Sequence, residues 1–168
     1  MSWTERSRRV PPLGWVALGL IAQQILAGGR RPSRASATLA GGTAVISLGL
    51  LASSVTSFRR RRTTVDPLTP ERARHLVVEG PFRITRNPMY VAMSGVLLAH
   101  AVARRSLLAL LPTAGFVVVI NKSQIEAEEQ ALAANFGSDW GRYAATTPRW
   151  LSLRPLIRRD PGKATPVG

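Results

Sequence analysis

Two long stretches without a charged side chain constrain this fold more than any other feature of the sequence. They run from Val10 to Gly29 and from Ala35 to Phe58, and they are 20 and 24 residues long. A helix rises about 1.5 Å per residue, so about 20 residues cross the hydrocarbon core of a bilayer, which is about 30 Å thick. A soluble domain seldom needs two such stretches, and they therefore predict two membrane-spanning helices.

Two shorter uncharged stretches follow, from Pro88 to Ala103 and from Ser106 to Asn121. Each holds 16 residues, and only Arg104 and Arg105 separate them. At about 1.5 Å per residue each helix would reach about 24 Å, which is short of a full hydrocarbon core. A tight helical hairpin explains this arrangement, with tilt or local thinning of the bilayer making up the difference. Because both ends of a hairpin emerge on one side, we expect the segments at Asn87 and Lys122 to be neighbours.

The sequence thus predicts an all-α integral membrane protein of about four transmembrane helices, the last two forming a short hairpin. With four spans, 18 of the 23 basic residues fall on the side of the two termini and of residues 59–87. The positive-inside rule places that side, with the C-terminal region, in the cytoplasm, so we expect a multi-pass protein of the inner or plasma membrane. The net charge of +14 then mostly reflects topology and requires no nucleic-acid partner.

Changes in composition divide the chain into three predicted parts. Residues 1–62 form an N-terminal two-helix membrane region, and residues 158–168 form a disordered basic tail. Residues 63–157 form a core that holds an interfacial segment, the hairpin and a C-terminal helix. Within the interfacial segment, Thr69 as a cap and Pro70 at the first position predict the start of a further short helix.

The polar and charged side chains that could bind a ligand or catalyse a reaction fall into two groups. One group precedes the hairpin and the other follows it, so both should lie at its open, cytoplasmic end. The first group is Arg83, Arg86, Asn87 and Tyr90, and the second is Glu126, Glu128 and Glu129. Adjacent helical residues point about 100° apart, so one of Glu128 and Glu129 can face a pocket while its neighbour turns toward solvent or an arginine. The two groups could equally form a charge clamp that only holds the hairpin's ends together. The chain has no cysteine and two scattered histidines, so no metal centre is expected.

At these residues the chain resembles the isoprenylcysteine carboxyl methyltransferase family, integral-membrane enzymes related to phospholipid N-methyltransferases. The stretches "GPFRITRNPMY" and "EEQALAANFGSDWGRY", followed by "PRW", carry the resemblance, which extends over residues 63–151. The matching positions are Gly80, Pro81, Phe82, Arg83, Arg86, Asn87, Pro88, Tyr90, Glu128, Glu129, Leu132, Phe136, Gly137, Tyr143 and Arg149. At Asn87 many relatives have a histidine, and Trp140 departs from the pattern by replacing a tyrosine.

The resemblance implies that residues 63–157 form a methyltransferase core, which binds S-adenosylmethionine at the cytoplasmic end of the hairpin. It also implies a lipid or lipophilic acceptor that enters from the bilayer. Residues implied at the cofactor are Arg83, Arg86, Asn87, Pro88, Tyr90, Glu128 and Glu129, with Arg86 and Glu129 as the catalytic candidates. The glutamates suit the cofactor's ammonium and an arginine suits its carboxylate.

A carboxylate is the expected acceptor, because it needs no proton acceptor, whereas an amine or a thiol must first lose a proton. Two other classes of protein stay open. One is a nicotinamide-dependent membrane reductase of the steroid-reductase type, although four spans are fewer than such a protein needs. The other is a non-catalytic assembly factor whose charged mouth binds a partner protein.

Overall fold

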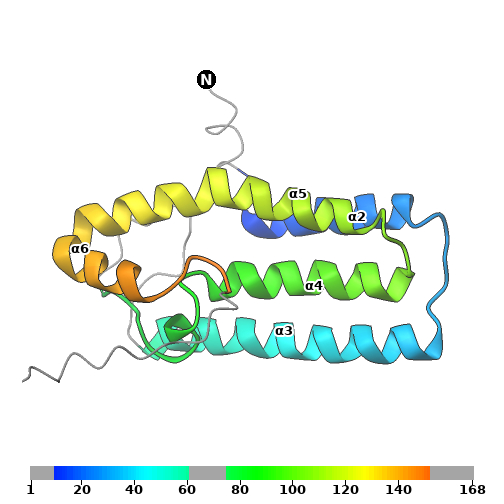
Figure 1. Cartoon of the computed structure of the whole chain (residues 1–168), viewed down its shortest axis with the longest axis horizontal. Coiled ribbons are helices and arrows are strands. Elements are labelled where there is room, and N and C mark those ends of the chain that lie inside the picture. Colours follow the sequence, from blue (N-terminus) through cyan, green and yellow to red (C-terminus); the bar gives the residue numbers. More distant parts are fainter. Residues whose placement is uncertain (1–9, 61–74, 152–168) are drawn as a thin grey trace, which may run out of the picture.

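The computed structural model describes residues 10–60 and 75–151, and within these ranges every regular element is helical. Four helices form a bundle, and the fourth continues through a π-helical turn into a long C-terminal helix (Figure 1). The bundle helices are α2 (Pro12–Leu26), α3 (Arg34–Arg60), α4 (Pro88–Arg104) and α5 (Leu110–Ile120). The remaining elements are the 3₁₀ turn η2 (Gly80–Arg83), the π turn η3 (Asn121–Ile125) and α6 (Glu126–Thr146).

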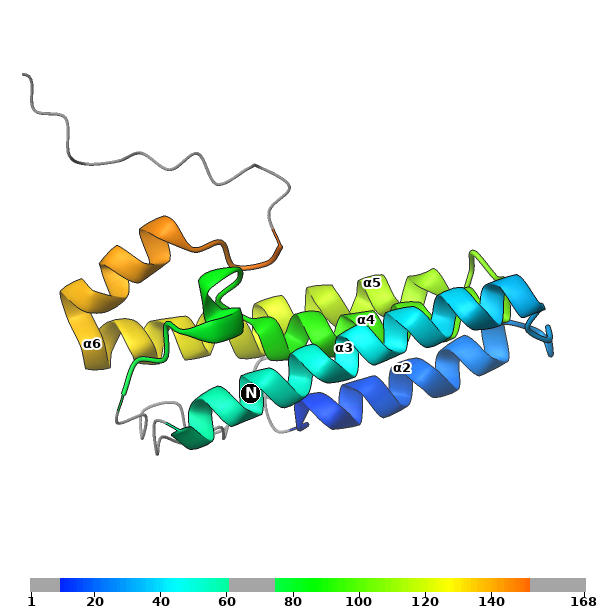
Figure 2. The same ribbon diagram turned by 90° about the horizontal axis from the view of Figure 1, so that it is seen from below.

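Helix α4 lies in the middle of the bundle and contacts α2, α3 and α5 (Figures 1 and 2). The predicted hairpin of α4 and α5 is present, with Arg105 in the left-handed conformation at the turn (φ 52°, ψ 40°). Beyond α5, the rod of η3 and α6 extends past the end of the bundle. It reverses at Gly137, whose φ of 50° and ψ of −118° are not helical, and its second part returns toward α4.

Small side chains allow α3 and α4 to approach closely. The buried residues of α3 are Ala40, Ser47 and Ser54, spaced seven apart on one face of the helix. Opposite them, a Cβ atom added to Gly95 would lie 2.1 Å from Oγ of Ser47. In lipid, helices associate by packing rather than by exclusion of water, so such close contact is what holds the pair together.

A polar side chain in the last turn of α2 connects three helices. The two N–H groups of the Gln23 amide, which is fully buried, are shared among the carbonyl oxygens of Leu97 and Ala109 and Oγ1 of Thr113, at 3.0, 2.8 and 2.9 Å. Its amide oxygen lies 2.9 Å from Nδ1 of His100. All the hydrogen-bonding groups of this glutamine are therefore satisfied inside the bundle, as buried polar groups require.

The outer surface of the bundle is apolar. Large side chains such as Leu18, Ile21 and Ile46 are more than half exposed, whereas seven of the 17 residues of α4 are buried and one is exposed. Of the described helices, α3, with 27 residues, is long and apolar enough to cross a membrane, and α2 is apolar but shorter. The fold is thus all-helical with four bundle helices, and the number of membrane spans stays a prediction.

Several sequence predictions fall on residues outside the described ranges. They include the domain boundaries at 62/63 and 157/158, the basic tail and the helix start at Thr69. The described end of that predicted helix, His75–Val78, is not helical.

Candidate active site

Hydrogen bonds join the loop before α4 to the segment that follows α6. The backbone N–H of Arg86 donates to the carbonyl oxygen of Pro148 at 2.8 Å. The carbonyl oxygen of Arg149 accepts from Oγ1 of Thr85 at 3.0 Å and from Nδ2 of Asn87 at 2.9 Å. Asn87 therefore uses its side-chain amide to hold the C-terminal segment over the mouth of the hairpin.

The guanidinium of Arg86 joins both halves of α6. Its NH1 donates to the carbonyl oxygens of Ala144 and Thr147, at 2.6 and 3.1 Å, where the helix leaves its last carbonyls without partners. Its NH2 donates to Oε1 of Glu129 at 2.9 Å, and its Cζ lies over the Trp140 ring, 5.6 Å from the ring centre. The side chain is only 13% exposed, so this ion pair is largely removed from water.

Two arginines share Glu129. Besides Arg86, Arg149 donates from Nε to Oε1 at 3.1 Å and from NH2 to Oε2 at 2.5 Å. Arg149 also reaches Oδ1 of Asn121, at the start of the π turn, which accepts from Nε1 of Trp150 as well. The charge clamp expected as one alternative is therefore present, and it is built from Glu129.

Glu128 faces a different environment from its neighbour. Its Oε1 accepts a hydrogen bond from the hydroxyl of Tyr90, and among the described residues it forms no salt bridge. Burial raises the pKa of Glu128 from 4.5 to about 7, an effect that the Tyr90 hydrogen bond partly offsets and the nearby Glu129 charge reinforces. This carboxyl group can therefore change its charge near neutral pH, and a cation placed beside it would favour the ionised form.

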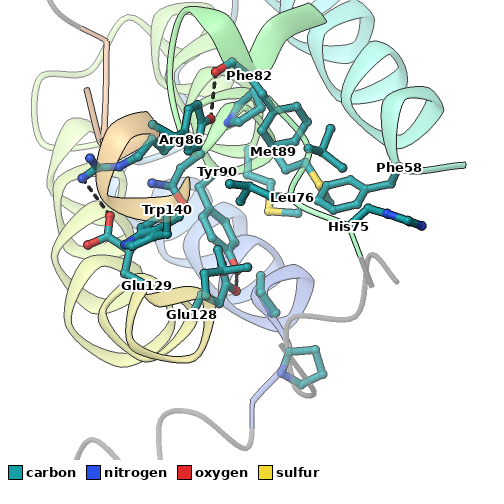
Figure 3. Close-up of a pocket in the computed structure, with 18 of the residues that line it drawn as sticks. Phe58, His75, Leu76, Phe82, Arg86, Met89, Tyr90, Glu128, Glu129 and Trp140 are labelled. Carbon is teal, nitrogen blue, oxygen red and sulfur yellow. Dashed lines mark hydrogen bonds and ion pairs between the residues drawn. The ribbon is translucent and has the colours of Figure 1, made fainter. Parts of the chain in front are cut away.

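A cavity of about 330 Å³ opens beside these residues (Figure 3). Its polar part contains Arg86, Asn87, Tyr90, Glu128, Glu129, Trp140 and Tyr143. Its apolar part contains side chains from the start of α2, the end of α3, the segment before η2 and the first turns of α4, among them Leu13, Phe58, Leu76, Met89 and Met93. One compartment thus combines charged groups with an apolar wall, which suits a ligand that has a charged and a lipophilic part.

The structure brings most of the predicted site residues together. Arg86, Asn87, Pro88, Tyr90, Glu128 and Glu129 all line this cavity. Arg83 is exposed and lies outside the lining, and Glu126 is exposed as well. The expectation that the segments at Asn87 and Lys122 are neighbours is confirmed by the Arg86–Glu129 ion pair, which joins residues 43 apart in sequence.

Sequence reasoning assigned no role to Trp140, Tyr143 and Arg149. The hydroxyl of Tyr143 donates to the carbonyl oxygen of Phe82 at 2.8 Å, and Trp140 is buried against Arg86. Both aromatic residues reach the cavity because α6 reverses at Gly137. The signal in the sequence was the glycine itself, since a φ of +50° suits a residue without a Cβ atom.

Comparison with known families agrees with this combination of an apolar helical bundle and a charged cavity at one end. The sequence model of the phospholipid methyltransferase family matches residues 36–139, so this chain belongs to that family. An uncharacterized protein of Haemophilus influenzae is 38% identical over 63 residues, which are 38% of this chain and the whole of that protein. No solved structure matches the chain.

Family membership defines the class of protein and its cofactor. The chain is a membrane methyltransferase that uses S-adenosyl-L-methionine, and the class of its substrate is lipid. The described residues fit this cofactor in two respects. Nε of Arg86 is buried with no hydrogen-bond partner among them, which leaves a donor for an anionic group. The carboxyl group of Glu128 has no cationic partner among them, which leaves an acceptor for a cationic group.

Proposed function

We propose that the cavity between α4 and α6 binds S-adenosylmethionine and that methyl transfer to a lipophilic acceptor takes place there. The observation that carries this proposal is that the two adjacent glutamates have different bonding partners. Glu129 is held by two arginines, whereas Glu128 lines the same cavity and, among the described residues, bonds only to the Tyr90 hydroxyl. A ligand that carries positive charge would therefore meet the second carboxylate.

Four charged residues in and beside the cavity have a part in this proposal. Glu128 binds the ammonium group of the cofactor, and the free Nε–H of Arg86 donates to its carboxylate. Glu129 and Arg149 are positioning residues, because they hold the Arg86 guanidinium against Trp140. The predicted catalytic roles of Arg86 and Glu129 thus become binding and positioning roles, and a contact of Arg83 with the cofactor stays a prediction.

The cofactor supplies an activated methyl group on a cationic sulfur. The chain's own contribution is to orient the two reactants and to exclude water from the reacting centre. The apolar residues Phe58, Met89 and Met93 form the wall against which the lipophilic part of the acceptor lies. We propose that the acceptor comes from the bilayer, and that the cavity lies on the cytoplasmic side with both termini.

A carboxylate is the first candidate acceptor, on the strength of the resemblance to isoprenylcysteine carboxyl methyltransferases. An amine is the second candidate, because the matching family is that of phospholipid methyltransferases. An amine must lose a proton before it can accept a methyl group. Glu128 does not take that proton in this proposal, because it is ionised beside the ammonium of the cofactor.

The experiment is methyl transfer from tritiated S-adenosylmethionine to membrane lipid extracts by the purified full chain in detergent. Label that mild alkali releases as volatile methanol comes from a methyl ester and identifies a carboxylate acceptor. Label that stays non-volatile after alkali identifies an amine. Absence of label in every lipid fraction, with cofactor binding intact, would contradict the proposed acceptor class.

The pH dependence of cofactor binding tests the role of Glu128. Its carboxyl group is neutral below about pH 7 and anionic above it, so affinity for the cationic cofactor should rise through this range. We expect the affinity to fall by up to about tenfold per pH unit below pH 7. Isothermal titration between pH 5.5 and 8.5 measures this slope, and a release of about one proton on binding near pH 6 should accompany it.

Glu128→Gln provides the matched control, because it keeps the size of the side chain and cannot ionise. It should bind the cofactor about tenfold more weakly at pH 8, with no dependence on pH across this range. Without cofactor, the contribution of Glu128 to the free energy of unfolding should fall as pH rises, whereas cofactor affinity rises. Because folding raises the pKa of Glu128 above 4.5, this group stabilises the fold at low pH, and that contribution is lost as pH rises through about 7. An unchanged slope in Glu128→Gln would assign the pH dependence to another group.

A further inference from the structure

A second hollow lies at the opposite end of the bundle from the cavity. There the connection from α2 to α3 meets the turn from α4 to α5, at the end of Figure 1 away from α6. Arg30, Arg31 and Arg105 line this hollow, which has a volume of about 250 Å³. We refer to it as the arginine hollow.

Among the described residues, the positive charge at this end has no acidic counterpart. Arg34 and Arg104 lie at the same end, whereas no aspartate or glutamate occurs between residues 6 and 65 or between residues 80 and 125. Clustered cations repel one another, so five arginines without a carboxylate favour the binding of an anion.

Hydrogen bonds from arginines to neutral acceptors connect the walls of the arginine hollow. NH1 of Arg30 donates to Oγ of Ser106 at 3.3 Å. Arg104 donates from NH1 to the carbonyl oxygen of Arg30 at 3.2 Å, and from NH2 to Oε1 of Gln24. These bonds connect the two loops and leave the charge of the arginines uncompensated.

The backbone at Arg105 gives an independent indication. Among the described residues, Arg105 has the single positive φ angle outside glycine, at 52°. A residue with a Cβ atom costs about 1 kcal/mol more than glycine in this conformation, and glycine or asparagine is usual at the end of a helix. A cation therefore occupies a position where the turn alone would favour glycine, and this cation lines the hollow.

We propose that the arginine hollow binds a phosphate group. Guanidinium groups donate several N–H bonds in a planar fork that matches phosphate oxygens, and phosphate carries the negative charge that this end lacks. The phosphate could belong to the headgroup of an anionic phospholipid or could be free in solution. Exposed apolar side chains beside the arginines, at Leu26, Leu107 and Leu108, offer contact for acyl chains. This proposal is independent of methyl transfer, because the hollow shares no lining residue with the cavity.

The test compares the full-length chain in detergent with its Arg105→Gly variant. Native mass spectrometry measures the retention of phosphatidylglycerol and of phosphatidylcholine with the same acyl chains, and titration calorimetry measures binding of inorganic phosphate. We expect the wild-type chain to retain phosphatidylglycerol preferentially or to bind inorganic phosphate. The first result identifies a lipid headgroup as the source, and the second identifies free phosphate.

Arg105→Gly should weaken that binding about tenfold, since it removes one charge-assisted contact. Its thermal midpoint without ligand should equal or exceed that of the wild type, because glycine relieves the left-handed backbone, so a folding defect would not explain the loss. Arg34→Gln removes the same charge from an exposed residue at this end that does not line the hollow, and it should bind as the wild type does. Equal losses in Arg34→Gln and Arg105→Gly, or no binding of either probe, would overturn the proposal.

Discussion

Arg86→Ala is expected to destabilise the protein by about 3–5 kcal/mol and to abolish binding of S-adenosylmethionine. The guanidinium is largely buried and bonds to Glu129, to two carbonyl oxygens of α6 and its end, and to the face of Trp140. Removing the guanidinium leaves the two carbonyl oxygens without this donor, at about 1–3 kcal/mol each, whereas Glu129 keeps Arg149 as a partner. Thermal unfolding in detergent measures the first effect, and isothermal titration below the lowered midpoint measures the second.

Arg142→Ala is the matched control for Arg86→Ala. Arg142 lies on α6 and pairs with Asp139 at 2.7 Å, but its side chain is 80% exposed. Exposed ion pairs contribute about 0–1 kcal/mol, so this variant should unfold and bind almost as the wild type does. Arg86→Lys keeps the charge but lacks the planar fork, and it should recover stability in part without recovering full affinity. If Arg86→Ala bound the cofactor as tightly as Arg142→Ala does, the proposed site would be wrong.

Gly95→Ala should lower stability by about 1–3 kcal/mol, the usual range for overpacking a close contact. The added Cβ atom would lie 2.1 Å from Oγ and 3.1 Å from Cβ of Ser47. Rotation of the Ser47 side chain can relieve the first contact at the cost of its hydrogen bond to Thr43, but the second contact still requires α3 and α4 to separate slightly. This displacement should also reach the cavity, because Phe58 at the end of α3 and Tyr90 at the start of α4 both line it.

Two further variants separate this contact from the general effect of removing glycine from a helix. Gly49→Ala, in α3, adds a Cβ atom with nothing within 4 Å and should stabilise the protein by up to about 1 kcal/mol. Combining Gly95→Ala with Ser47→Gly removes the clashing side chain and should restore much of the lost stability. Equal midpoints for Gly95→Ala and the wild type would show that the two helices do not approach this closely.

The sequence predicted the hairpin and the meeting of its charged ends, because charge-free stretches and their lengths determine both. It could not assign the partners of the two adjacent glutamates. Periodicity gives only the angle of about 100° between Glu128 and Glu129. The assignment depends on Arg149, a residue 20 positions away that approaches Glu129 because α6 turns back at Gly137.

The sequence also did not predict the π turn η3, which affects which glutamate bonds to Tyr90. A single π turn adds about one residue to a helix, so it rotates everything that follows by about 100°. Without the turn at Asn121–Ile125, Ala127 would point where Glu128 now meets Tyr90. No composition or spacing rule marks this stretch, since its residues follow the apolar end of α5 without a proline or glycine.

The central claim is that the cavity beside Arg86 and Glu128 is the binding site for S-adenosylmethionine. Photolabelling of the purified full chain with tritiated S-adenosylmethionine, followed by peptide mapping, tests it most directly. The aromatic residues Tyr90, Trp140 and Tyr143 line the cavity, so label should appear in peptides that contain them and should disappear with excess unlabelled cofactor. Competed label found only in other peptides, or cofactor binding without label in these three, would contradict the claim.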